Sequence, residues 1–296
     1  MTRTPQTDTD TRPLPVNQET GWQRFARLMR EAPLSVWFAL IVLGFYVVLV
    51  AFAGVIAPYP ETEILGAGFL PPSTAHPMGT DALGRDFLSR MIFAARNTVL
   101  IAIATTVLSF AVGGFLGLLA ATLGGRIDQL LGRSVDVLMS IPPLIFTLLL
   151  LSIFGTSTLN LVLIIALVDA TRVFRMARAV AMGVVVMDYV EAARLRGESL
   201  LWIVLREVLP NTMAPLMAEF GLRFCFVFLT ISALSFLGLG IQPPAADWGT
   251  MVRENASLIS FGDLTPLYPA TAIGLLTICV GFISDWALKL SSGLKD

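Results

Sequence analysis

The chain has 296 residues, of which 55% are hydrophobic and only 14% are charged, and its mean hydropathy is +0.78. In soluble domains about a quarter of the residues are usually charged, so this composition excludes an ordinary soluble domain and favours a protein embedded in lipid. The net charge of −1 excludes a general basic attraction to nucleic acid, and no nucleic-acid partner is expected.

Apolar runs long enough to cross about 30 Å of hydrocarbon, roughly 20 residues each, recur along the chain. They indicate spans within residues 32–60 and 97–125, two shorter spans within 137–168 hinged at 155–160, and further spans within 213–240 and 264–284. No stretch shows the alternating pattern of barrel strands, so the spans are expected to be helices, which satisfy their own backbone hydrogen bonds in lipid. The predicted fold is an all-α, polytopic membrane protein with six transmembrane helices.

The positions of the arginines and lysines predict the orientation. With six spans both termini lie on one side, and that side receives most of the basic residues, including those of the N-terminal tail and of residues 126–133 and 172–206. The other side receives only Arg85, Arg90, Arg96 and Arg253. The positive-inside bias therefore predicts that both termini are cytoplasmic.

This orientation divides the chain into four predicted regions. Residues 1–33 form a cytoplasmic tail with an interfacial helix in its second half, and residues 34–96 form the first transmembrane helix and a periplasmic loop. Residues 97–290 form the core of the protein, with a cytoplasmic loop at 188–211, and residues 291–296 form a cytoplasmic C-terminal tail.

The first outer loop ends in an amphipathic pattern, HPMGTDALGRDFLSRMIFAARNT, at residues 76–98. Leu83, Phe87 and Met91 recur every four residues, while Asp86 and Arg90 have the spacing of an i,i+4 ion pair. The pattern predicts a helix that lies on the outer surface and leads into the second span.

The second span contains Gly113 and Gly117, which form a small-xxx-small face. Such a face permits two helices to approach closely. Helix packing within the chain is the simpler interpretation, and a moving interface with a partner subunit is the alternative.

The most polar interior stretch is DYVEAARLRGESLLWIVLREVLPN, residues 188–211. Asp188 and Glu191 have the spacing of an N-cap and its reciprocal partner, which predicts a helix that starts there. Gly197 permits a sharp change of direction, and Pro210 is expected to end a second short helix. The apolar face of that helix is expected to comprise Leu201, Leu205, Val208 and Leu209. The stretch therefore predicts a helical elbow. Periodicity alone, however, favours an ordinary loop between two spans, whose helices merely cover the membrane interface.

Two charged residues, Glu219 and Arg223, stand four apart in the fifth span. Each would cost several kcal/mol if it faced lipid alone, so we expect the pair to face the helix bundle or a partner subunit. Both a structural ion pair and a lining of the transport path are compatible with the spacing.

The chain lacks the residues that several kinds of site need. His76 is the only histidine, and Cys225 and Cys279 fall in apolar runs, so no catalytic triad, metal site or disulfide is expected. Lys289 and Lys295 are the only lysines, whereas a P-loop needs a lysine beside a glycine-rich turn. No catalytic, cofactor-binding or metal-binding residue is therefore predicted, and any ATP must be bound by another subunit.

The elbow resembles the EAA motif of ABC importer permeases, in which E-A-A is followed at fixed spacing by glycine and then by Leu-Pro. In that family the elbow sits in a groove of the cytoplasmic ATPase and transmits its closure to the spans. The resemblance implies an ATPase-coupling role for Glu191, Ala192, Ala193, Gly197, Leu201, Leu205, Leu209 and Pro210.

The segments at residues 76–98, 136–144 and 234–251 are similar to those of the dipeptide, oligopeptide and nickel permease group, on the side of its C-type subunit. The resemblance implies an N-terminal helix added to a five-helix core in the inner membrane. It also implies a second homologous permease, two ATPase subunits that bind ATP and Mg²⁺, and a periplasmic substrate-binding protein as partners. Peptides are the expected substrate, with nickel, glutathione, opines or other small solutes as alternatives.

By the same resemblance, four outer residues are candidates for a periplasmic docking or gate-lining surface: Arg85, Asp86, Arg90 and Trp248. An ordinary interfacial tryptophan is the alternative for Trp248.

Two other classes of function compete with the importer. A self-sufficient secondary transporter or channel predicts ion-coupling carboxylates or histidines within the spans and an internal inverted repeat. A membrane-embedded hydrolase would need a nucleophile and a base, which the lone His76 does not supply. Both classes leave the elbow unexplained.

Overall fold

The structure, a computed structural model, describes residues 29–30 and 32–292. The first part of the chain contains α2 (Leu34–Ile56), α3 (Phe87–Ser109), the π-helical turn η1 (Phe110–Gly114), α4 (Phe115–Leu123), α5 (Gly125–Met139), α6 (Pro143–Phe154) and α7 (Thr158–Val185). The second part contains α8 (Asp188–Leu195), α9 (Leu200–Trp202), the π-helical turn η2 (Ile203–Val208), α10 (Leu209–Phe236), α11 (Trp248–Asn255), the 3-10 turn η3 (Ala256–Phe261) and α12 (Leu267–Ser292). The prediction of an all-α fold is confirmed. The predicted interfacial helix of the N-terminal tail and the last four residues lie outside the described part of the chain.

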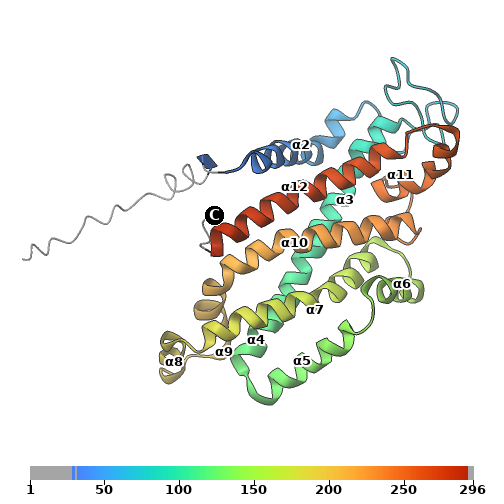
Figure 1. The fold of residues 1–296 in the computed structure, drawn as a ribbon. Coiled ribbons are helices and arrows are strands. Elements are labelled where there is room, and N and C mark those ends of the chain that lie inside the picture. The colour runs from blue at the N-terminus through green and yellow to red at the C-terminus, as the bar shows by residue number, and fades with distance from the viewer. Residues whose placement is uncertain (1–28, 31, 293–296) are drawn as a thin grey trace, which may run out of the picture. The chain divides into compact units, whose positions relative to one another are not determined.

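The arrangement of the helices is that of the unit which begins at Ser35. Helix α10 packs against α12, α7 and α3, and α7 packs against α3, η1 and α4 (Figure 1). The loop that follows α2 and the short helix α11 lie at one end of these long helices, and α8 and α9 lie at the other end (Figure 1). The segments predicted to lie on the outer side and on the cytoplasmic side of the membrane are therefore at opposite ends of the long helices.

Four helical segments are long and apolar enough to cross a membrane: Leu34–Ile56, Phe87–Leu123, Leu200–Phe236 and Leu267–Leu290. The pair formed by α5 and α6, bent by 85°, raises this number to five if it is one broken span. Helix α7 has 28 residues, but Asp169 and three arginines make it less apolar than the others. The count of six spans stays a prediction.

The second span begins ten residues earlier than the apolar run at 97–125 indicated, because the amphipathic segment is itself the first part of α3. The predicted pair of Asp86 and Arg90 is wrong. Asp86 caps the helix by accepting a hydrogen bond from the Ser89 backbone N–H at 2.8 Å, and the Arg90 Nε lies 3.2 Å from an oxygen of Asp81 instead. A capping carboxylate must lie over the helix end, which directs it away from the side chain four residues later.

The hinge predicted at residues 155–160 is present, but the two segments beside it are not two short spans. Gly155 has a φ of +86° after α6, and the Ser157 side chain caps α7. Helix α6 has only 12 residues, whereas α7 continues 17 residues past Val168 through its charged positions. The predicted span ended at the first charged residue, whereas the helix continues because Arg172 and Arg175 line a cavity and Arg178 contacts Asp128 on α5.

Pro210 does not end a helix, contrary to the prediction. Residues Leu200–Phe236 form one continuous helical path, in which the π-helical turn η2 precedes the proline and the Leu209 N–H bonds to the Val204 carbonyl five residues back. A proline ring clashes with the carbonyl four residues before it in a regular α-helix. The wider π turn changes the register there, so the helix passes through Pro210.

The glycine face of the second span packs against α7 within this chain. A Cβ built on Gly113 would overlap the backbone carbonyl of Ala170, and one built on Gly117 would come too close to the carbonyl of Phe174. The face therefore serves helix packing inside the subunit, and it is not an interface with a partner.

Candidate functional site

The elbow begins at α8, whose first residue is Asp188 as predicted, but the predicted capping box is wrong. Met187 is the N-cap residue and provides no side-chain hydrogen bond. Asp188 and Glu191 are already within the helix, where carboxylates interact favourably with its positive end. Gly197 has a φ of +79° and its N–H donates to the Arg194 carbonyl at 3.0 Å, so the predicted change of direction at this glycine is confirmed.

One side of the elbow is fixed to the ends of the long helices. Val190 and Ala193 are fully buried, in a cluster with Val204 and Val208 of η2. Leu118 of α4 and two alanines of α7 belong to the same cluster. Because Ala193 is in contact on all sides, a larger side chain at this position would push the elbow away from the spans.

The opposite side of the elbow is exposed. Glu191, Ala192 and Gly197 are solvent-accessible, and so are several large apolar side chains: Val186, Met187, Tyr189 and Leu195. The sequence analysis did not identify these apolar residues. Apolar side chains that lie near Val190, on or beside a polar eight-residue helix, are a signal that could have indicated an exposed apolar surface.

The predicted apolar face of the second elbow helix is only partly correct. Val208 is buried and Leu209 is partly buried, whereas Leu201 and Leu205 are 53% and 44% exposed. The π turn rotates the side chains relative to an α-helical register, so Ile203 and Val204 face the core in their place.

Two polar contacts that the sequence analysis missed connect the ends of the helices that lie next to the elbow. Arg194 of α8 donates from Nη2 to the carbonyl oxygen of Thr122 at the end of α4, at 2.9 Å. Arg178 of α7 makes a two-point contact with the carboxylate of Asp128 on α5, with Nη2 and Oδ2 2.6 Å apart. No local spacing links partners that are 50 or more residues apart, so sequence alone could not pair them.

The outer charged residues form a buried network. The Arg85 Nε donates to Asp81 at 2.7 Å, and Arg90 lies against the same carboxylate. Asp86 accepts hydrogen bonds from Ser89 and lies 3.0 Å from the Nδ1 of His76. Arg85, Asp86 and Arg90 are at most 7% exposed, so the predicted docking surface is not exposed at these residues, and their gate-lining role stays a prediction. In the structure they fix the outer loop to the start of α3.

Trp248 is also buried, with 1% exposure, which fits neither an exposed docking contact nor an interfacial tryptophan. Its gate-lining role stays a prediction. Its Nε1 donates to the Met91 carbonyl at 3.1 Å, and its ring packs edge-on against Tyr46 and Phe228. The preceding residue, Asp247, caps α11 through the Gly249 and Thr250 N–H groups. Burial raises the pKa of Asp247 above its usual value, and the hydrogen bonds that this carboxylate accepts offset only part of the rise.

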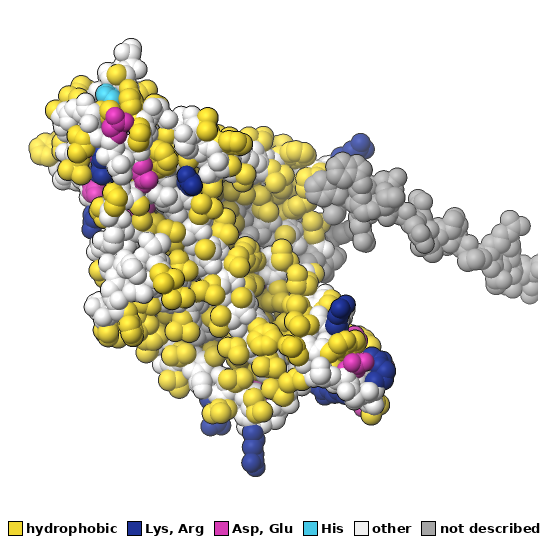
Figure 2. Space-filling model, turned by 180° about the vertical axis from the view of Figure 1, so that it is seen from behind, with side chains coloured by type: hydrophobic (Ala, Val, Ile, Leu, Met, Phe, Trp, Pro, Cys, Tyr) yellow, Lys and Arg dark blue, Asp and Glu magenta, His cyan; other side chains and the backbone are white. Residues whose placement is uncertain are grey.

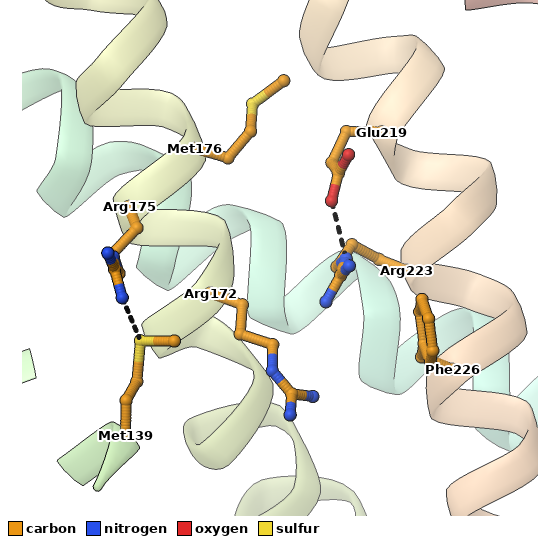
Figure 3. A pocket seen from close by; sticks show the side chains of 7 residues that line it. All are labelled: Met139, Arg172, Arg175, Met176, Glu219, Arg223 and Phe226. Atoms are coloured by element: carbon orange, nitrogen blue, oxygen red, sulfur yellow. Dashed lines mark hydrogen bonds and ion pairs between the residues drawn. The ribbon is translucent and has the colours of Figure 1, made fainter. Parts of the chain in front are cut away.

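A cavity of about 560 Å³ opens between α7 and α10 near the end of α5. Figure 3 shows the side chains that line it: Arg172, Arg175 and Met176 of α7, Glu219, Arg223 and Phe226 of α10, and Met139 of α5. The predicted pairing of Glu219 with Arg223 is confirmed, with Nε and Oε1 2.7 Å apart. The pair faces a cavity at the middle of two long helices, so its two predicted roles, structural pair and path lining, are compatible.

Comparison with known proteins identifies the family. Residues 113–292, more than half of the chain, match the family described as binding-protein-dependent transport system inner membrane component. The chain belongs to this family. The protein is thus a multi-pass inner-membrane permease subunit of an ABC importer, which decides against the self-sufficient secondary transporter or channel.

Curated relatives resemble the permease over almost their full length. The di/tripeptide transport system permease protein DppC of Pseudomonas aeruginosa (strain UCBPP-PA14) is 35% identical over 93% of this chain and 89% of its own. The probable D,D-dipeptide transport system permease protein DdpC of Escherichia coli (strain K12) is 33% identical over 86% and 85%. The glutathione transport system permease protein GsiD of Pectobacterium atrosepticum is 30% identical over 94% and 90%.

The surface of the permease agrees with a membrane location. In Figure 2 hydrophobic side chains cover the middle of the face shown, and charged side chains gather toward two ends. Exposed apolar residues such as Leu34, Ile41 and Val55 on α2 suit contact with lipid tails. No group of three or more potential metal ligands occurs among the described residues.

Proposed function

We propose that the permease is the C-type subunit of an ATP-driven importer of short peptides. In this proposal a second, homologous permease completes the membrane pathway, and a periplasmic binding protein delivers the substrate to the outer end. Two cytoplasmic ATPase subunits bind ATP and Mg²⁺ and contact the elbow. The permease itself is non-catalytic and holds no cofactor.

The construction of the elbow carries this proposal. Its exposed apolar side chains provide a surface for an ATPase groove, while its buried side is fixed to α4 and α7 through the Val190 cluster and through Arg194. A displacement of α8 by a closing ATPase would therefore be transmitted to two long helices. In the proposed mechanism the binding protein and the ATPases would bias one element with two positions from two distant sites, which is the requirement for coupling.

The relatives support short peptides as the substrate class. Their names specify di- and tripeptides, D,D-dipeptides and glutathione, which are all short peptides or peptide-like molecules. Nickel complexes and opines stay alternatives without an observation in their favour.

The arrangement of the helix ends supports cytoplasmic termini. The ends of α2 and α12 that lead into the outer loop and α11 lie together, and their other ends lie toward the side of the elbow (Figure 1). If the elbow contacts cytoplasmic ATPases, both termini are on the cytoplasmic side.

The test is affinity purification of the permease from its native membrane, comparing the wild type with Gly197→Pro. Proline fixes φ near −65° and cannot adopt the +79° of Gly197, so the elbow cannot keep its shape. We expect the wild type to retain a second permease and the ATPases, and the variant to lose the ATPases but keep the second permease.

A matched control is available at the other end of the protein. Gly262 has a φ of +80°, and its N–H also bonds to the carbonyl three residues before it, at the same 3.0 Å as in the elbow. Gly262→Pro therefore introduces the same strain at the outer end, and we expect the ATPases to be retained. Purification of the wild type alone or as a homo-oligomer would overturn the proposed function.

A further inference from the structure

The arginines that line the cavity differ in how they are neutralised. Arg223 lies 2.7 Å from Glu219 and 3.8 Å from Asp169, and Arg175 lies 4.0 Å from the exposed Asp136. Arg172 has no carboxylate within 4.0 Å among the described residues, although Asp169 acts on it from a longer distance. In Figure 3 its side chain extends from α7 into the space between α7 and α10. Arg172 is therefore the cavity's least neutralised cation.

A cation in this position needs a reason. Arg172 lies in the middle of the 28-residue helix α7. An arginine at the depth of the hydrocarbon is costly unless it faces water or an anion, and such residues commonly mark the path of a substrate. The guanidinium group is planar and presents its donors as a fork that matches both oxygens of a carboxylate. The open donors of Arg172 thus fit a carboxylate that arrives in the cavity.

The rest of the lining is suited to a variable ligand. Met139, Met176 and Phe226 provide apolar surface, and methionine adapts its shape to different groups because its chain is unbranched and flexible. The cavity volume of about 560 Å³ is in the range of small-ligand sites, about 300–1,000 Å³. Arg172, as the cation without a close carboxylate, and the adaptable apolar wall beside it would together accept ligands that share a carboxylate and differ elsewhere.

We propose that Arg172 binds the C-terminal carboxylate of the peptide as it passes through the cavity. This inference rests on the proposed function, since it assigns the contact for the peptides that the importer carries. Every linear peptide with a free C-terminus has this carboxylate whatever its side chains are, so the contact selects the class of substrate and not its sequence. Glu219, already paired with Arg223, keeps the neighbouring arginine from competing for the same anion.

The test places a reporter cysteine in the cavity of the assembled transporter, reconstituted in vesicles without nucleotide. Met176→Cys is introduced after Cys225 and Cys279 are changed to alanine. Its reaction rate is measured with an anionic and a cationic methanethiosulfonate reagent. We expect the anionic reagent to react several-fold faster, and millimolar dialanine to slow its reaction whereas dialanine amide does not.

Variants of the arginines identify the residue responsible. In Arg172→Gln we expect the preference for the anionic reagent to fall and the concentration of dialanine needed for protection to rise about tenfold or more, as for loss of a charge-assisted hydrogen bond. Arg172→Lys retains the charge but not the fork, so it should keep the reagent preference and lose part of the protection. Arg175→Gln, on the same helix, should keep both.

The outcomes separate the two proposals. Equal protection by dialanine and its amide, protection that persists in Arg172→Gln, or no reaction of the cysteine with either reagent would overturn the assignment of Arg172. ATP-driven peptide uptake by the parent without the two native cysteines, with its binding protein added, is measured in the same vesicles. Absence of that uptake counts against the peptide importer itself, and uptake without selective protection counts against Arg172 alone.

Discussion

Two regions of the permease are built from the same residue types, arginine with aspartate or glutamate, but with opposite results. At the outer end Asp81, Arg85 and Arg90 are buried and share contacts of 2.7–3.2 Å. In the cavity Arg223 lies 2.7 Å from Glu219, but its contact with Asp169 and that of Arg175 with Asp136 are 3.8 and 4.0 Å long. Among the described residues, Arg172 has no carboxylate within 4.0 Å. The comparison teaches that burial and distance decide whether a charged cluster holds the structure together or stays available to a ligand.

The largest effect is expected from Asp81→Asn at the outer end. This change leaves Arg85 and Arg90 buried without their shared anion, and breaking a buried pair in this way costs roughly 3–5 kcal/mol. We expect a large loss of thermal stability, measured by the temperature at which the purified permease leaves its size-exclusion peak in detergent. Glu63→Gln, at an exposed position of the same loop, is the control and should stay within about 0.5 kcal/mol.

A smaller effect is expected from Glu219→Gln in the cavity. Arg223 keeps Asp169 at 3.8 Å and can still face the water of the cavity, so the loss should be at most about 1 kcal/mol, the upper end for ion pairs that water can reach. The same thermal measurement applies. A loss as large as that of Asp81→Asn would contradict the distinction between the two regions.

The smallest effect is expected from Asp136→Asn. Its carboxylate lies 4.0 Å from Arg175, and both side chains are more than half exposed, so the change should be below about 1 kcal/mol. The matched comparison is Asp128→Asn on the same helix, because Asp128 contacts Arg178 at two points. If the two variants lose the same stability, contact geometry does not rank these pairs.

The sequence predicts those helices whose signal is local. Length and apolar composition locate α2, α10 and α12, and the hinge after α6 follows from Gly155 and Ser157. Local rules fail where a distant contact decides. The charge of Arg172 and its neighbours ended the predicted span early, since only the folded protein shows that they face a cavity.

The candidate site follows the same division. Gly197 is predictable because a turn needs a residue that tolerates positive φ, and the Glu219–Arg223 pair is predictable because it lies within one helical turn. The burial of Trp248 and the link from Arg194 to Thr122 depend on partners in other segments. The outward position of Leu201 and Leu205 depends on a π turn that no residue pattern announces.

The close contact at Gly113 and Gly117 limits how the permease can move. The backbone of α7 lies where a side chain at either glycine would be. The helix that contains the two glycines and α7 therefore cannot roll or slide past each other without separating, and they move together as one rigid pair. The elbow is attached to both. Because the elbow also continues into α10 through η2, its displacement would act both on this pair of helices and on α10, and the seam between them is the wall of the cavity that contains Arg172.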